Sequence, residues 1–487
     1  MSYTTDEGNL FQTDAQHEKS AIRAVRSQYL GERGQPIKLA TKPIRVVLRE
    51  QPGKEAEAWV AESGFVVRRV GLETGKTKQI YRGHNGPVTS VAFYTTTAPD
   101  KRELLISGSW DRSFRVWDVQ TKTHLSTTVG HIDFVKTLTV IPSLKILVTG
   151  SSDKDIRIWD LSPLDSLDIA SITSSAPRPE EEKDDATPAP QQTGAAPPPA
   201  ASLCPLSCLF ALKAHTRPIE QLVSYPLLEP LPEGVEADEV DVATRRRTGK
   251  VALLSADSMG AVKVWELWRD ERGEIQGKLR CEVRHHELGI YDMQVGPEGE
   301  LWTASADNSV LLSQLSLTSA SEPPVPTLRI PHPAQTRSLL PLPLSSLAYS
   351  PSAASHIHYL LTGSSDELIR IFDLCDSSLD PSPSREQKRD WRGIALDLSA
   401  TPEGYVKEIE GHTHEIVQLC AYSTLSGEAW ILSASLDGTL RRWKWPDVLK
   451  EKVDKLVIVP VEEEELKKES LLTEEEEREL AELMGED

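Results

Sequence analysis

One spacing recurs along this chain and limits the folds that it can adopt. A Ser or Thr is followed by Asp four residues later and by a large apolar residue six positions beyond that. The first copy, SGSWDRSFRVWD, contains Ser107, Asp111 and Trp117, and His84 lies upstream of it. Serine, histidine and aspartate are also the residues of a hydrolytic triad. A catalytic site occurs once in a chain, so the repetition of these residues favours a structural role.

Four further copies keep both the hydroxyl residue and the aspartate. They contain Thr149, Asp153 and Trp159; Thr303 and Asp307; Thr362 and Asp366; and Ser433, Asp437 and Trp443. Ser313 and Phe372 take the Trp position in two of these copies. A sixth copy, SADSMGAVKVWE, keeps Ser255 and Trp265 but has Met259 at the aspartate position. A histidine lies upstream of every copy: His84, His131, His215, His286, His332 and His412.

Each repeat is expected to form four short strands. In the clearest one these are VTSVAFY, ELLISGS, SFRVWDV and HLSTTV, separated by turn-forming residues. From about Pro43 to Trp445 the chain resembles the WD40-repeat family, whose repeats form the blades of a β-propeller. The segments IRVVLREQ, EAWVAES, FVVRRVGLE and KQIYRG supply a degenerate unit before His84. We therefore expect an all-β fold, a single seven-bladed propeller with short N- and C-terminal helices.

The resemblance implies what the repeated polar residues do. In the family, the His, Ser/Thr, Asp and Trp of one repeat form a hydrogen-bonded chain inside a blade. His84 would then be held by Asp111, with Ser107 and Trp117 bonded at the two ends. Each buried hydrogen bond of this kind contributes about 1 kcal/mol net. The resemblance therefore implies structural tetrads in place of catalytic residues.

The chain divides into three regions. Residues 1–35 form an N-terminal extension, in which Thr13, Gln16 and Gly31 predict the two ends of a short helix. Residues 36–460 form the propeller. Residues 461–487 form an acidic tail that carries a net charge of −10, from 13 acidic and three basic residues. The tail is expected to contain a helix, which serves either to increase solubility or to dock on a basic partner.

Three insertions interrupt the blades, at about residues 163–205, 226–248 and 375–404. The first includes PRPEEEKDDATPAPQQTGAAPPPAAS, which is rich in Pro and charge and poor in large apolar side chains. Such a composition does not offset the entropy lost on ordering, so we expect these insertions to be disordered.

The composition of the 487 residues narrows the environment and the ligands. No apolar run reaches the length of about 20 residues that a membrane span needs, and the N-terminus lacks the layout of a signal peptide. Five cysteines without a metal-binding spacing fit a reducing compartment, so we expect a cytoplasmic or nuclear protein. The formal charge of −20 argues against direct binding of nucleic acid. We expect no cofactor and no metal site.

The expected function is a non-enzymatic scaffold that assembles a multiprotein complex on the faces of the propeller. One alternative is the substrate receptor of a ubiquitin ligase, although the Trp-Asp pairs read WDVQ and WDLS and lack the Arg that such receptors often carry two residues later. Another is a non-catalytic subunit of an RNA-modifying or ribosome-assembly complex. Arg68 and Arg69 resemble part of a phosphoinositide-binding signature, but pairing across strands explains them more simply.

The family resemblance also indicates where partners bind. The commonest docking surface of the family carries the turns between the second and third strands and the segments after each histidine. The residues before each aspartate lie there: Trp110, Ser152, Ala306, Ser365 and Leu436. So do residues that follow the histidines: Phe134, Arg217, Arg337 and Glu415. Trp110 and Phe134 are expected side by side as an interface hot spot. The alternative is that both rings fold against their own blades.

Overall fold

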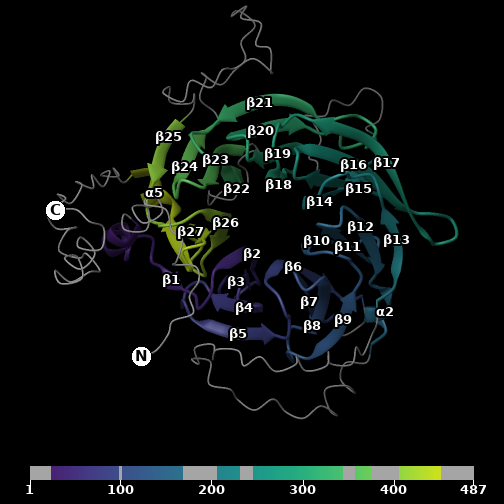
Figure 1. Ribbon diagram of the computed structural model, residues 1–487, viewed down its shortest axis with the longest axis horizontal. Helices are drawn as coiled ribbons and strands as arrows, with labels where there is room; N and C mark the ends of the chain where they lie inside the picture. Colours follow the sequence, from purple (N-terminus) through teal and green to yellow (C-terminus); the bar gives the residue numbers. More distant parts are fainter. Residues whose placement is uncertain are drawn as a thin grey trace, which may run out of the picture. The chain divides into compact units, whose positions relative to one another are not determined.

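The computed structural model describes residues 23–97, 101–167, 206–230, 245–343, 357–374 and 405–450. These residues form seven antiparallel sheets of four strands each, which follow one another around a ring (Figure 1). The predicted single seven-bladed β-propeller is confirmed.

The first three blades consist of strands that follow one another in the chain. Blade 1 contains β2 (Pro43–Arg49), β3 (Glu57–Glu62), β4 (Val66–Gly71) and β5 (Thr77–Arg82). Blade 2 contains β6 (Val88–Thr95), β7 (Glu103–Ser109), β8 (Ser113–Asp118) and β9 (His124–Val129). Blade 3 contains β10 (Val135–Ile141), β11 (Ile146–Ser151), β12 (Ile156–Asp160) and β13 (Cys208–Leu212). The predicted degenerate unit is therefore blade 1.

The next three blades repeat the same order. Blade 4 contains β14 (Ile219–Leu228), β15 (Arg247–Asp257), β16 (Ala261–Arg269) and β17 (Ile275–Arg284). Blade 5 contains β18 (Ile290–Val295), β19 (Glu300–Ser305), β20 (Ser309–Gln314) and β21 (Val325–Pro331). Blade 6 contains β22 (Thr336–Pro343), β23 (Ile357–Ser364), β24 (Ile369–Asp373) and β25 (Tyr405–Ile409).

Blade 7 joins the two ends of the propeller. It contains β26 (Ile416–Ser423), β27 (Ala429–Ser435) and β28 (Thr439–Lys444), and its outermost strand is β1 (Ile37–Lys38) from the N-terminal side. Ile37 lies opposite Leu440 in this pairing. Because the fourth strand comes from the other end of the chain, the ring is closed by hydrogen bonds within one sheet.

Apolar side chains fill the space between neighbouring blades. Trp59 of blade 1 and Leu105 and Trp117 of blade 2 belong to one buried cluster. Phe114 of blade 2 meets Trp159 of blade 3 edge to face, with ring centroids 5.0 Å apart. A single blade cannot bury these faces alone, so each blade depends on its neighbours for stability.

The helices of the described residues are short, and two of the predicted insertions are narrower than expected. Residues 23–30 are helical, as are α2 (Ser162–Asp165) and α5 (Trp445–Lys450). The first insertion does not begin at residue 163, because Asp165 of α2 is fixed by Tyr94, Thr97 and Lys145. The second predicted insertion, residues 226–248, is shorter because its first residues belong to β14 and its last residues belong to β15. The third insertion, the remainder of the first two and the acidic tail lie outside the described residues.

Candidate partner-binding face

Blade 2 shows how the repeated polar residues are connected. His84 Nδ1 lies 2.9 Å from the Asp111 carboxylate, and His84 Nε2 lies 2.8 Å from Ser107 Oγ. The indole N–H of Trp117 donates to the same Ser107 Oγ over 3.2 Å. The Asp111 carboxylate also accepts the backbone N–H of Ser113. The chain of bonds thus ties β7, β8 and the turn between them to the loop that precedes β6.

The same arrangement recurs around the ring. In blade 3, His131 binds Asp153 at 2.9 Å and Thr149 at 2.7 Å. The corresponding histidine bonds lie within 2.7–2.9 Å in blades 5 and 7. Their members are His286, Thr303 and Asp307 in blade 5, and His412, Ser433, Asp437 and Trp443 in blade 7.

Blade 4 keeps the arrangement with an aspartate that the regular spacing misses. His215 Nδ1 lies 3.2 Å from Asp257, two residues before Met259, and its Nε2 lies 2.7 Å from Ser255. The Asp257 carboxylate also accepts the backbone N–H of Met259 over 2.9 Å. Trp265 still donates to Ser255. The aspartate has therefore moved within the turn while its role is retained.

Blade 6 departs from the prediction. His332 Nε2 lies 3.0 Å from Thr362, but its Nδ1 faces the backbone carbonyl of Ile330 at 3.2 Å. Asp366, expected to hold this histidine, pairs with Arg370 at 2.6 Å. The correction has a physical cause, since a buried guanidinium four residues away takes both carboxylate oxygens. Phe372, at the Trp position, has no indole N–H to offer Thr362.

Blade 1 replaces the histidine network with ion pairs. The buried Arg68 guanidinium binds Glu62, whose carboxylate also accepts the Thr41 hydroxyl at 2.5 Å. The next residue along β4, Arg69, donates hydrogen bonds of 2.8 and 2.9 Å to the Glu57 carboxylate. Both arginines are engaged across strands, as the simpler interpretation predicted.

Burial and hydrogen bonding set the protonation states of the tetrads. Burial lowers the pKa of His84 and outweighs the effect of the neighbouring Asp111, so the imidazole is neutral at pH 7. Burial alone would raise the pKa of the carboxyls, but their hydrogen bonds from histidine prevail. The pKa falls to about 2 for Asp153, Asp307 and Asp437. Burial also lowers the pKa of His412, so in blade 7 a neutral histidine donates to the ionised Asp437 carboxylate.

The geometry of a hydrolytic triad is present in blade 2, but its serine is closed to substrate. Ser107 is 0% exposed, and its oxygen already contacts both His84 and Trp117. Thr149 and Ser433, its counterparts in blades 3 and 7, are equally buried. A nucleophile must reach a carbonyl carbon at close range, which such burial prevents.

A backbone hydrogen bond repeated in all seven blades defines one face of the ring. The turn between the second and third strands donates an amide to the segment just before the first strand, over 2.9–3.0 Å. The donor residues are Ser63, Trp110, Ser152, Ser258, Ala306, Ser365 and Leu436. The acceptors include Phe134 and Glu415. We call the surface that carries these turns the turn face, and the predicted docking residues lie on it.

Trp110 and Phe134 stack on each other across blades 2 and 3. Their ring centroids lie 5.1 Å apart with an interplanar angle of 19°. The two residues are 44% and 42% exposed, so neither is folded away against its own blade. Ile132, which sequence reasoning missed, is 78% exposed two residues before Phe134. Its position directly after a tetrad histidine was the signal that could have identified it.

The charged residues predicted for this face are not gathered around the aromatic pair. Arg337 pairs with Glu415 at 3.1 Å, and its guanidinium lies 3.9 Å from the ring centroid of Tyr291. These contacts link blades 5, 6 and 7. Arg217 is exposed on blade 4 and forms no ion pair with another described residue. The structure therefore separates the predicted set into an aromatic pair, a paired arginine and a lone arginine.

A second polar network joins the inner strands of several blades. The buried Asp292 carboxylate of blade 5 accepts from the Gln221 amide of blade 4 at 3.2 Å and from the Leu339 backbone N–H of blade 6 at 3.0 Å. Arg45 of blade 1 lies 3.8 Å from the same carboxylate. This network ties non-adjacent blades together, and no repeat pattern indicates it.

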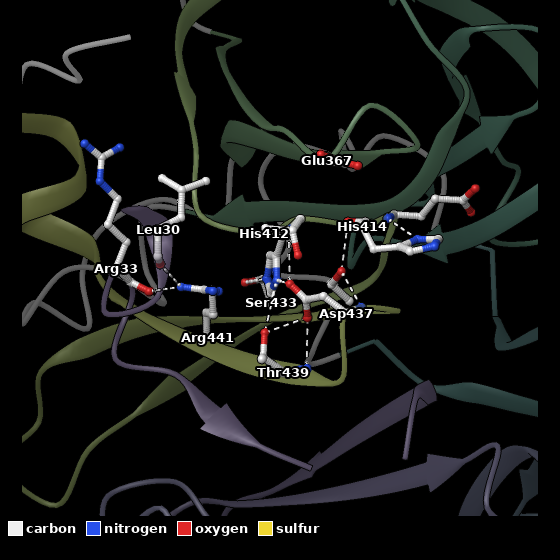
Figure 2. A network of polar contacts seen from close by, with 12 residues as sticks. Leu30, Arg33, Glu367, His412, His414, Ser433, Asp437, Thr439 and Arg441 are labelled. Carbon is white, nitrogen blue, oxygen red and sulfur yellow. Dashed lines mark hydrogen bonds and ion pairs between the residues drawn. The ribbon is translucent and has the colours of Figure 1, made fainter. Parts of the chain in front are cut away.

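The N-terminal segment is attached to blades 6 and 7. Arg23 binds Glu367 of blade 6 at 2.8 Å, and Arg26 binds the same carboxylate. Figure 2 shows Arg441 of blade 7 bonded to the carbonyls of Leu30 and Arg33, next to the tetrad of His412. The described part of the predicted helix, residues 23–30, thus docks on the propeller, while Thr13 and Gln16 lie outside the described residues.

Two features are missing from the described part of the chain, a cluster of metal ligands and a membrane-spanning helix. Within it, no three His, Cys, Asp or Glu side chains come together as metal ligands. Among the helices described, none is long and apolar enough to cross a membrane.

Three segments of the chain match repeats of a known family. The WD domain, G-beta repeat, matches residues 75–118, 122–160 and 404–444. Each match runs from the outermost strand of one blade through the first three strands of the next, namely β5 to β8, β9 to β12 and β25 to β28. The chain contains WD40 repeats and folds as a ring of four-stranded blades. An uncharacterized WD repeat-containing protein of Schizosaccharomyces pombe is 23% identical over 416 residues, which cover 84% of this chain and 82% of the relative.

Two shorter similarities involve homologues of periodic tryptophan protein 2. The Schizosaccharomyces pombe protein is 32% identical over 82 residues, or 16% of this WD40 chain and 9% of the relative. The Neurospora crassa protein is 37% identical over 75 residues, or 15% of this chain and 8% of the relative. These matches are limited to a fraction of each protein, so they indicate shared repeats.

Proposed function

We propose that this WD40-repeat protein is a non-enzymatic scaffold that binds partner proteins on the turn face of its propeller. The observation that carries the proposal is the stack of Trp110 on Phe134. Trp110 and Phe134 are each more than 40% exposed, so the stacked residues leave apolar area in contact with water. Aromatic clusters of this kind are typical of interface hot spots.

The tetrads support the non-enzymatic part of the proposal. Their hydroxyl groups are buried and already hydrogen-bonded, and the same set recurs from blade to blade. The described cysteines Cys208, Cys281 and Cys420 are free thiols, which fits the expected cytoplasmic or nuclear location.

The test is a comparison of the proteins that co-purify with three forms of the full chain. These are the wild type, the double variant Trp110→Ala/Phe134→Ala, and the control Leu425→Ala. Leu425 is 59% exposed and follows β26, at the end of blade 7 away from the turn face. We expect the double variant to lose partners that the other two retain, with an unchanged melting temperature. Identical sets of partners for all three forms would contradict the proposal.

A further inference from the structure

We propose that the partner segment that docks on the Trp110–Phe134 stack is an acidic stretch of protein carrying an apolar anchor side chain. This inference rests on the proposed function and specifies the chemistry of its partner.

The first observation is the charge at one recurring position of the turn face. The residue after the repeat aspartate has a positive φ in five blades, and in three of them it is charged: Arg112 at 68°, Lys154 at 74° and Glu367 at 76°. These three side chains therefore start from equivalent points of their turns. Two of them are cations beside the aromatic stack, and the third is an anion on another part of the ring.

Glu367 shows what this position does when a segment covers it. Its carboxylate is bound by Arg23 and Arg26, which come from the helical residues 23–30. The side chain of Glu367 is only 8% exposed as a result. At blade 6, the turn face thus holds a segment of opposite charge.

At blades 2 and 3 the corresponding charges are open. Arg112 and Lys154 are exposed and form no ion pair with any other residue that the structure describes, and the same holds for Arg217 of blade 4. By the same electrostatic logic, these cations favour a segment rich in Asp and Glu. Nearby Lys136 does not add to this charge, because it pairs with Glu220 at 2.5 Å.

The apolar part of the surface lies among these cations. Trp110 precedes Arg112 by two residues on the same turn, and the Phe134 carbonyl accepts the amide of Ser152, on the turn that carries Lys154. The basic–aromatic patch therefore comprises Trp110, Arg112, Ile132, Phe134 and Lys154. Its rings offer a contact for an apolar anchor, and Arg112 and Lys154 come from the two turns that carry or contact these aromatic residues.

The arrangement of the rings favours a protein as the partner of this patch over single-stranded nucleic acid. Trp110 and Phe134 stack on each other at 5.1 Å, so no slot between them is open to a base. Proteins that bind nucleic acid combine stacking with a continuous row of phosphate contacts, whereas this patch has two open cations on a chain of net charge −20.

The probe for the test is a library of random dodecapeptides displayed on phage and selected on the full-length protein. We expect the enriched peptides to be acidic and to share an aromatic or branched aliphatic residue. Selection on Trp110→Ala/Phe134→Ala should not enrich the same sequences. Failure to enrich peptides, or enrichment of basic or uncharged ones, contradicts the inference.

The affinity of one enriched peptide for each variant, measured by fluorescence anisotropy, then separates the contribution of the aromatic rings from that of the cations. Loss of both rings should weaken binding by about thirtyfold, the effect of a typical hot spot. The charge reversal Arg112→Glu/Lys154→Glu should weaken it by about tenfold and reduce its dependence on salt. The matched control is Lys122→Glu, since Lys122 is also exposed with a φ of 60° but lies beyond the opposite end of β8.

The outcomes distinguish the chemistry of the partner from the function itself. If peptides that need Trp110 and Phe134 are not acidic, the scaffold function stands and the acidic partner is wrong. If Lys122→Glu weakens binding as much as the double charge reversal, the patch is not the site. Tighter binding of a labelled twelve-nucleotide oligothymidine than of any selected peptide would assign the patch to nucleic acid.

Discussion

Replacing Asp437 with alanine should destabilise the propeller more than replacing Asp366, although both occupy the same position of their blades. Asp437 accepts hydrogen bonds from His412 at 2.9 Å, from the backbone of Thr439 at 2.9 Å and from the hydroxyl of Thr439 at 2.7 Å. Asp366 holds no histidine, and its main partner Arg370 also binds Glu408 at 3.2 Å.

The magnitude for Asp437 follows from its titration. A fall in the carboxyl pKa from 3.8 to about 2 corresponds to about 2 kcal/mol of stability at neutral pH. Because the pKa is lower in the folded state, this contribution is present above about pH 4 and is lost as the pH falls through about 2. Removing the carboxylate also leaves the His412 N–H without its acceptor, which adds about 1 kcal/mol or more.

The assay is urea unfolding followed by tryptophan fluorescence at pH 7. We expect Asp437→Ala to lower the free energy of unfolding by about 3 kcal/mol and Asp366→Ala by about 1 kcal/mol, since the latter breaks a partly exposed ion pair. Equal losses for the two variants, or a greater loss for Asp366→Ala, would refute the reasoning.

Three further perturbations address other parts of the structure. Burial lowers the pKa of His332 to about 4, so its neutral form is required for folding and stability falls as the pH drops below about 6.5. The free energy of unfolding of the wild type should therefore fall by about 2 kcal/mol more than that of His332→Gln between pH 7.5 and pH 5, as measured by urea unfolding. An equal fall in the two proteins would exclude this role of His332. Asp292→Ala should cost about 3 kcal/mol in the same assay, because it leaves Arg45, the Gln221 amide and a backbone N–H without their shared acceptor; a cost below about 1 kcal/mol would show that the network is not stabilising. Arg441→Met should increase hydrogen exchange of residues 23–38 by about tenfold or more and leave blades 2 to 4 unchanged, because it releases the carbonyls of Leu30 and Arg33; uniform exchange across the chain would contradict a local attachment.

The repeat spacing predicted the blades because it records local geometry. The aspartate sits in a tight hairpin turn and the Ser or Thr lies on the strand before it, so both must fall at fixed distances in the sequence. The stacked pair could be anticipated for the same reason. Trp110 and Phe134 occupy equivalent ends of neighbouring blades, and their exposure follows from that position.

What the sequence did not predict depends on contacts between residues far apart in the chain or on competition within a turn. Asp257 reaches His215 from a shifted position, and Arg370 draws Asp366 away from His332, neither of which spacing can reveal. The closing strand Ile37–Lys38 is only two residues long and has no pattern of its own. Arg45 and Asp292 meet only once the ring has closed.

The central claim is that the repeated Ser/Thr, His and Asp residues build the blades and perform no hydrolysis. The most direct measurement is labelling of the folded full-length chain with a fluorophosphonate, which reacts with nucleophilic serines, followed by mass spectrometry. A serine hydrolase in the same tube controls for reactivity of the probe. Because Ser107 is buried between His84 and Trp117, we predict no adduct at this residue. A stoichiometric adduct at Ser107 that His84→Ala abolishes would contradict the account.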